Sequence, residues 1–176
     1  MQGTTTVDVF KKHPNPVFIE TGSYIGDGIN MALMAGFSEV YSIELSPQLY
    51  NKCIIRFSGR NNVHIYQGDS TIVLKKLLPK INQRVTFWLD GHYSGPGTAL
   101  GKTNSPILQE LAIIASHPIK NHTILIDDVR LFGTVEFDFV DINEIVDAIR
   151  KINPNYIFYF ENGYVPNDVL VAKILE

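Results

Sequence analysis

Acidic residues recur in this sequence at the ends of its apolar, β-prone segments, where their carboxylates could act together. Five successive segments carry such acids, and the fourth also carries a histidine: Glu20, Glu44, Asp69, Asp90 with His92, and Asp127 with Asp128. For any one acid, a solvated helix cap is the better interpretation, but five in sequence order favour a shared site. Carboxylates can accept hydrogen bonds from ribose hydroxyls, bind a hard divalent cation, or assist a histidine in proton transfer.

A glycine-punctuated turn follows the first of these acids. The stretch Val17–Gly28 reads V-F-I-E-T-G-S-Y-I-G-D-G. A strand, a glycine turn and a helix N-terminus form a cradle in which the backbone approaches a ligand closely. The dinucleotide pattern G-x-G-x-x-G/A fails because Met31 stands three residues after Gly28, and Asp27 would face a pyrophosphate. S-adenosylmethionine, a cofactor without phosphates and with cationic sulfonium and amino groups, suits this turn better.

Alternating strand and helix patterns would position these acids along one edge of a sheet. The predicted strands are Val17–Thr21, Glu39–Glu44, Val63–Gln67, Arg84–Asp90, Thr123–Asp127, Tyr156–Phe160 and Val169–Ile174. Helical spacing or cap signals separate most of them, and a short loop joins the last two as an antiparallel pair. This order predicts an α/β fold with a mostly parallel sheet, helices on both faces and an antiparallel last strand. Ligands of such sheets bind beyond the carboxyl ends of the strands.

Length and composition indicate an ordinary globular chain. The 176 residues fit one domain, with residues 1–16 as a polar lead-in whose two prolines disfavour a helix. The net charge of −3 and the lack of a basic run do not indicate a nucleic-acid surface. The single cysteine, Cys53, excludes an internal disulfide. No long apolar run or leader is present, so we expect no membrane insertion and a cytoplasmic location. A homodimer is compatible with the sequence, which sets no oligomeric state.

Several of these motifs resemble those of a known family. The glycine turn, Ile43-Glu44 and Gln67–Ser70 (Q-G-D-S) together resemble motifs I to III of the class I S-adenosylmethionine-dependent methyltransferases. Trp88–Ser94 (W-L-D-G-H-Y-S) and Leu125–Arg130 (L-I-D-D-V-R) resemble the metal-binding stretches of macrocin-type O-methyltransferases, which act on sugars of natural products. The resemblance implies a Rossmann-like methyltransferase fold with a seven-stranded sheet.

The resemblance also implies which residues bind the cofactor. Glu20 and Gly22 would line its methionine end, Glu44 would hold the ribose hydroxyls, and Asp69 with Ser70 would meet the adenine amine. The full set implied is Glu20, Gly22, Ser23, Tyr24, Gly26, Glu44, Leu45, Asp69, Ser70 and Asp90. The substrate expected beside this cofactor is a small hydroxylated molecule.

Asp90, Asp127 and Asp128 match the family's carboxylate ligands for Mg²⁺ or another divalent cation. Adjacent strand residues point to opposite faces, so Asp127 and Asp128 can both ligate only if the chain has already turned. Without a cation, such close carboxylates repel each other and the pKa of at least one should rise. His92 is the histidine placed at a strand end, which makes it, with Asp90, a candidate catalytic residue. Arg130 either binds an anionic substrate group or pairs with a nearby acid.

Three functional hypotheses remain open from the sequence. The first is a metal-assisted O-methyltransferase, the second a methyltransferase that uses His92 as its base without metal, and the third a cofactor-binding accessory domain without turnover. The glycine-rich segment Gly91–Asn104 is either a lid over the site or an ordinary exposed loop. No residue specifies the methyl acceptor.

Overall fold

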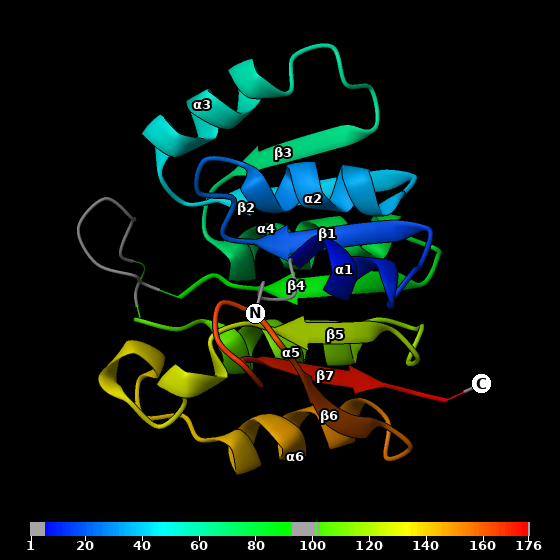
Figure 1. Ribbon diagram of the computed structural model, residues 1–176, viewed down its shortest axis with the longest axis vertical. Helices are drawn as coiled ribbons and strands as arrows, with labels where there is room; N and C mark the ends of the chain where they lie inside the picture. The colour runs from blue at the N-terminus through cyan, green and yellow to red at the C-terminus, as the bar shows by residue number, and fades with distance from the viewer. Residues whose placement is uncertain (1–5, 93–100, 102, 176) are drawn as a thin grey trace.

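A seven-stranded sheet forms the centre of the computed structural model, which describes residues 6–92, 101 and 103–175 (Figure 1). The strands are β1 (Val17–Thr21), β2 (Glu39–Glu44), β3 (Val63–Gln67), β4 (Val85–Leu89), β5 (Thr123–Ile126), β6 (Ile157–Glu161) and β7 (Val169–Lys173). They lie in the order β3-β2-β1-β4-β5-β7-β6. Pairing is parallel from β3 to β5, whereas β7 runs antiparallel to both β5 and β6. The predicted mostly parallel sheet with an antiparallel last strand is confirmed.

Helices cover both faces of this sheet. They are α1 (Thr6–Lys11), α2 (Asp27–Ala35), α3 (Pro47–Arg56), α4 (Ser70–Leu77), α5 (Ile107–Ser116) and α6 (Ile142–Ile152), with short 3₁₀ turns η1 (Leu78–Lys80), η2 (Val129–Leu131) and η3 (Val135–Phe137). In Figure 1, α1 and α2 lie in front of the sheet and α4 and α5 behind it. Within the described residues, no helix is both long and apolar enough to cross a membrane.

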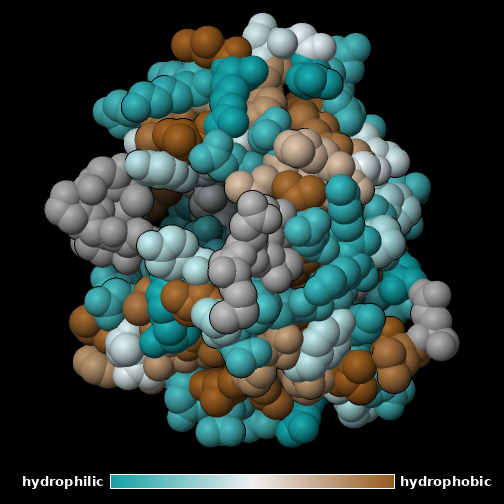
Figure 2. Space-filling model, in the orientation of Figure 1, coloured by the Kyte–Doolittle hydropathy of each residue, from teal (hydrophilic) through white to brown (hydrophobic). Residues whose placement is uncertain are grey.

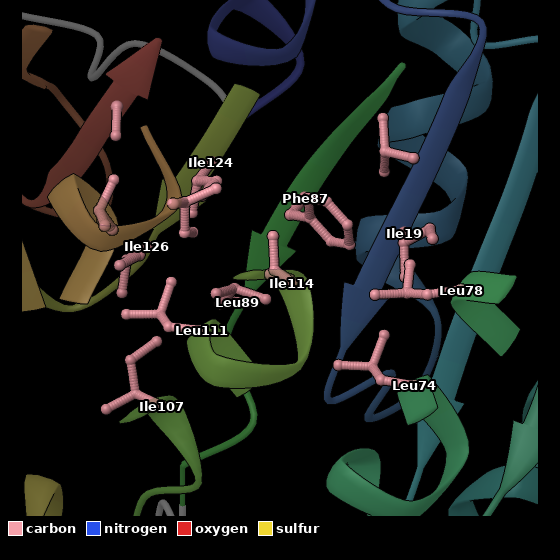
Figure 3. Close-up of a cluster of buried hydrophobic side chains, with 14 of the residues drawn as sticks. Ile19, Leu74, Leu78, Phe87, Leu89, Ile107, Leu111, Ile114, Ile124 and Ile126 are labelled. Carbon is pink, nitrogen blue, oxygen red and sulfur yellow. The ribbon is translucent and has the colours of Figure 1, made fainter. Parts of the chain in front are cut away.

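Side chains that alternate along each strand build one core on each face. On one face, Phe18 and Trp88 pack with Ile29 of α2 and Cys53 of α3. On the other, the neighbours of these strand residues pack with α4, α5 and α6, as Figure 3 shows for Ile19, Leu74, Phe87, Leu111, Ile114 and Ile124. Burial on both faces explains why the central strands read as nearly continuous apolar runs.

The lead-in differs from its prediction, because it contains helix α1. Val9 and Phe10 of this helix are fully buried, and the Phe10 ring lies 4.8 Å from that of Phe18 and 5.0 Å from that of Trp88. The prolines at positions 14 and 16 exclude a helix only after α1 has ended. A helix of six residues is too short to show an apolar period, and its packing stabilises it instead.

The strand register sets the edge at which the acids meet. Thr21 pairs with Leu89, and Leu89 pairs with Ile126. The residues that follow, Gly22, Asp90 and Asp127, therefore leave three neighbouring strands at the same level. In Figure 1 this carboxyl edge faces left, and η2 and η3 lie beside it.

Candidate active site

The glycine turn after β1 packs closely against the end of β4. Gly22 has a φ of +90°, and a side-chain carbon at this position would lie 2.4 Å from the carbonyl oxygen of Asp90. Gly26 has a φ of +87°, and the same substitution there would meet the Phe57 ring at 2.5 Å. L-residues with side chains disfavour such φ values. Both glycines are thus required by the turn itself, and Gly22 brings the turn directly onto Asp90.

Glu20 is a buried carboxyl group beneath the turn. The hydroxyl of Ser42 on the neighbouring strand donates to Glu20 Oε1 at 2.5 Å, and Ser42 also contacts the hydroxyl of Ser23. The first turn of α2 rests on the same carboxyl, because a side-chain carbon at Gly28 would lie 2.0 Å from Glu20 Oε2. Burial raises the pKa of Glu20 to about 8, and the negative charge of Glu44 adds to the rise. A positive charge beside this carboxyl would favour its ionised form and lower its pKa.

Glu44 ties the glycine turn to the loop after β2. Its Oε2 accepts a hydrogen bond from the backbone N–H of Tyr24, and its Oε1 accepts one from that of Ser46, both at 2.8 Å. Tyr24 adopts a left-handed φ of 49°, and the carbonyl of Leu45 accepts from the Gln67 side chain at 2.9 Å. Each carboxylate oxygen has two lone pairs, so Glu44 can still accept two further hydrogen bonds, as a pair of ribose hydroxyls requires.

Asp69 and Ser70 begin α4 at the third strand end. Asp69 Oδ1 accepts from the backbone N–H of Thr71 at 2.9 Å and from its hydroxyl at 2.6 Å, so this carboxylate caps the helix. Burial raises the pKa of Glu110 on α5 to about 7. A second buried carboxyl group therefore lies on the face of the sheet opposite Glu20.

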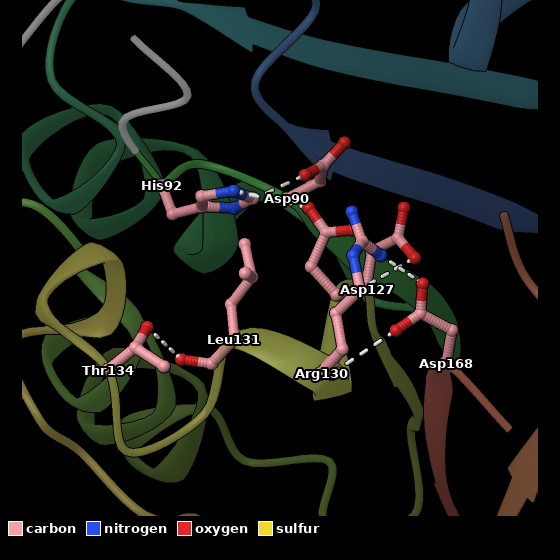
Figure 4. A network of polar contacts seen from close by, with 8 residues as sticks. Asp90, His92, Asp127, Arg130, Leu131, Thr134 and Asp168 are labelled. Atoms are coloured by element: carbon pink, nitrogen blue, oxygen red, sulfur yellow. Dashed lines mark hydrogen bonds and ion pairs between the residues drawn. The ribbon is translucent and has the colours of Figure 1, made fainter. Parts of the chain in front are cut away.

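His92 contacts two aspartates that leave neighbouring strands, and Figure 4 shows its ring pointing toward one of them, Asp90. Its Nε2 is 3.1 Å from Asp128 Oδ2, and its Nδ1 is 3.5 Å from Asp90 Oδ1. The ring is buried against Phe137, with centroids 5.0 Å apart. Burial lowers the pKa of His92 despite the charge of Asp128, so the imidazole is neutral near pH 7. Burial and the charges of Asp127 and Asp128 raise the pKa of Asp90, in the direction predicted for carboxylates without a cation.

The chain turns immediately after β5, which brings Asp127 and Asp128 to the same edge. Asp128 has a left-handed φ of 62°, and its N–H donates to Asp127 Oδ1 at 2.9 Å. Burial and the charge of Asp128 raise the pKa of Asp127 to about 7. Arg130 pairs with nearby acids: its Nη1 lies 2.5 Å from Asp128 Oδ1, and it forms a second ion pair with Asp168. The turn that would allow Asp127 and Asp128 to bind the same ligand is therefore present.

Among the residues that the structure describes, two groups of side chains have donor atoms close enough to share a cation. Asp90, His92 and Asp128 form one group and Asp127, Asp128 and Asp168 the other, and the donor atoms within each lie within 4.8 Å of one another. The three predicted ligands thus divide between two groups that share Asp128. Carboxylate oxygens suit Mg²⁺ or Mn²⁺, so the residues present fit a divalent cation.

Sequence analysis missed two buried acids at this edge. Asp168 is 1% exposed, and its Oδ1 accepts from the backbone N–H of Arg130 at 3.2 Å. Nothing in the spacing relates two residues 38 positions apart. Glu110 is also 1% exposed, and its signal was available, because it is the one acid within the apolar stretch Ile107–Ala115.

Figure 2 shows a hollow in the molecular surface beside this carboxyl edge, with both hydrophilic and hydrophobic atoms visible in its wall. The glycine-rich segment Gly91–Asn104, expected to be either a lid or an ordinary loop, begins directly after Asp90, but its residues 93–100 and 102 lie outside the described part of the chain.

Comparison with known proteins supports the fold assignment through structure rather than sequence. No family model and no curated protein match the sequence. The SAH-bound methyltransferase PaMTH1 of Podospora anserina is similar over 97% of this chain and 76% of its own, with a TM-score of 0.64 and 14% identity. The O-methyltransferase TomG of Streptomyces achromogenes, in complex with SAM and involved in tomaymycin synthesis, is similar over 97% and 78%, with a TM-score of 0.61 and 13% identity.

An O-methyltransferase from Bacillus cereus in complex with SAH is similar over 97% of this chain and 77% of its own, with a TM-score of 0.58 and 13% identity. At such identities the likeness establishes the fold. The chain has the Rossmann-like fold of the class I methyltransferases.

Proposed function

We propose that this protein is an S-adenosylmethionine-dependent methyltransferase that methylates a hydroxyl group of a small metabolite or sugar with the help of a divalent cation. One observation carries the proposal. The glycine turn expected to hold the methyl donor rests on Asp90. Asp90 also belongs to the acidic cluster, which consists of Asp90, Asp127, Asp128 and Asp168. A methyl donor and an activated hydroxyl must meet within van der Waals reach, and this juxtaposition provides for it.

The residues at the first two strand ends fit the cofactor. S-adenosylmethionine supplies an electrophilic methyl group on a sulfonium, and its other cationic group is an amine. Within the described residues, the hydrogen bonds of Glu20 and Glu44 come from hydroxyl and backbone groups rather than from basic side chains. Glu20 would favour the cationic methionine end, Glu44 would accept from the ribose hydroxyls, and Asp69 would accept from the adenine amine.

The acidic cluster would activate the acceptor. A divalent cation bound by Asp90, Asp127 and Asp128 would lower the pKa of a bound hydroxyl. His92 is neutral near pH 7 and could take up the released proton. Asp128 would keep the imidazole oriented through the 3.1 Å contact with Nε2.

The contact between His92 and Asp128 also supports a second candidate, a methyltransferase that needs no metal. An imidazole oriented by a carboxylate is a common general base. In this case His92 would deprotonate the acceptor directly, and Asp128 would stabilise the resulting imidazolium. A third candidate, a cofactor-binding accessory domain without turnover, shares the cofactor site but predicts no product.

Product analysis separates these candidates. The protein is incubated with methyl-labelled S-adenosylmethionine and a panel of hydroxylated sugars, phenols and other metabolites, and products are identified by mass spectrometry. A labelled methyl ether that forms only with metal supports the main proposal, and one formed equally with chelator supports the His92 base. Cofactor binding without any product across the panel favours the accessory domain. When Asp90→Asn is assayed in the same way, Asp138→Asn, which alters an acid outside the cluster, serves as its control.

A further inference from the structure

Arg130 places a positively charged side chain against two members of the acidic cluster. Its guanidinium contacts Asp128 Oδ1 at 2.5 Å and also pairs with the buried carboxylate of Asp168. Figure 4 shows the side chain reaching toward Asp168 beside Asp127. The two groups of potential metal ligands meet at Asp128, so Arg130 holds the residue that both groups need.

Both oxygens of Asp128 are engaged by protein groups. Oδ1 faces Arg130 and Oδ2 faces His92 Nε2 at 3.1 Å. A divalent cation that uses this carboxylate must share an oxygen with the guanidinium or displace it. Because Arg keeps its charge at all accessible pH values, a cation at Asp128 would also experience repulsion from Arg130 at close range.

Arg130 would keep other contacts if Asp128 bound a cation in its place. Its backbone N–H and its side chain both bind Asp168, so the residue stays anchored if the contact with Asp128 breaks. Its side chain is 39% exposed, and the guanidinium carbon lies 5.7 Å from the centre of the exposed Tyr164 ring. A small outward movement would keep one ion pair and one aromatic contact.

We propose that Arg130 is an internal counter-ion that competes with a divalent cation for Asp128, and that Asp168 sets the balance by drawing Arg130 away. The inference deepens the proposed function and rests on it for the metal at Asp90, Asp127 and Asp128. It assigns Arg130 and Asp168 as positioning residues that determine how tightly this site binds metal.

The test is a Mn²⁺ titration followed by electron paramagnetic resonance, which reads metal binding without turnover. Arg130→Gln should tighten Mn²⁺ binding by about tenfold or more, because a close like charge is removed. Arg130→Lys keeps the charge and should remain nearer to the wild type. Asp168→Asn should weaken binding, because it removes a potential metal ligand and also frees Arg130 for Asp128.

Arg56→Gln is the matched control. Arg56 pairs with Asp27 at 2.7 Å, away from the cluster, and the substitution changes the net charge equally. Circular dichroism and thermal unfolding of each variant establish that it is folded, and Arg130→Met, which also removes the charge, decides if Arg130→Gln does not fold.

Unchanged or weaker Mn²⁺ binding in folded Arg130→Gln overturns the inference, as does equal tightening in Arg130→Gln and Arg130→Lys or in Arg56→Gln. If neither the wild type nor Arg130→Gln binds Mn²⁺, the inference falls together with metal assistance. Calorimetry with S-adenosylhomocysteine on the same samples then shows whether the methyltransferase proposal stands, because that binding needs no metal.

Discussion

Replacing Glu20 with Gln should make the protein more stable at alkaline pH. Below its unfolded-state pKa of 4.5, Glu20 is protonated in both states, whereas the native carboxyl keeps its proton up to about pH 8. Between these values the native state binds the extra proton, so the stability of the wild type falls as pH rises. Gln cannot ionise, and its side-chain oxygen can still accept the hydrogen bond from Ser42.

The magnitude follows from the width of this window. Each pH unit is worth about 1.4 kcal/mol for one proton. Between pH 5 and pH 9, the free energy of unfolding of Glu20→Gln should therefore rise relative to the wild type by about 4 kcal/mol. Urea denaturation at both pH values measures this difference. Glu39→Gln, which alters an exposed carboxylate on β2, controls for net charge.

The same variant should bind S-adenosylhomocysteine more weakly, since it removes the carboxyl that we propose faces the cationic methionine end. Stability gained together with affinity lost is the pattern expected of a residue retained for binding rather than for folding. An equal stability difference at pH 5 and pH 9, or a variant less stable than the wild type at pH 9, would refute this account of Glu20.

Three further predictions concern the turn, the metal and the histidines. Gly22→Ala should destabilise the protein by roughly 3 kcal/mol or more in thermal unfolding, since it adds a clash to the left-handed φ; Gly36→Ala has a similar φ of +96° with open space around it, and should cost about 1–2 kcal/mol. Chelator should abolish turnover and Mg²⁺ should restore it, while Asp90→Asn loses turnover and keeps cofactor affinity. Burial lowers the pKa of His122 to about 4, so the wild type should lose stability relative to His122→Gln as the pH drops from 6.5 toward 4.

Each of these predictions has a contrary outcome. Equal losses in Gly22→Ala and Gly36→Ala would mean that the contact with Asp90 is relieved at no cost. Turnover that survives chelator and is lost in His92→Ala would replace the metal with the general base. Parallel stability curves for the wild type and His122→Gln between pH 6.5 and 4 would show that His122 does not contribute to the pH dependence of stability.

The strands of the sheet could be predicted from the sequence because the central strands are buried on both faces. Apolar runs with turn signals at their ends predicted β1, β2 and β3 to the residue. The helix caps are equally local: the Ser46 hydroxyl accepts from the backbone N–H of Leu49, and Asp141 forms a capping box with Glu144. These features depend on contacts within a few residues, which a single sequence displays.

The candidate site was only partly predictable, because its contacts are long-range. The sequence identified the acids at the strand ends, but the left-handed turn at Asp128 and the Arg130–Asp168 pair depend on how β7 meets β5. The division of the predicted metal ligands into two groups follows from that turn. Helix α1 was missed for a related reason, since its stability comes from Phe10 packing on Phe18 rather than from its own pattern.

The central claim is that the glycine turn and Glu44 bind S-adenosylmethionine, and calorimetry tests it most directly. The wild type should bind S-adenosylmethionine or S-adenosylhomocysteine with micromolar affinity, about 8 kcal/mol, and in preference to NAD. Glu44→Ala should weaken that binding by roughly 1–3 kcal/mol through lost hydrogen bonds to a charged group, whereas Glu39→Ala at the other end of β2 should not. A preference for NAD, or unchanged affinity in Glu44→Ala, would contradict the account.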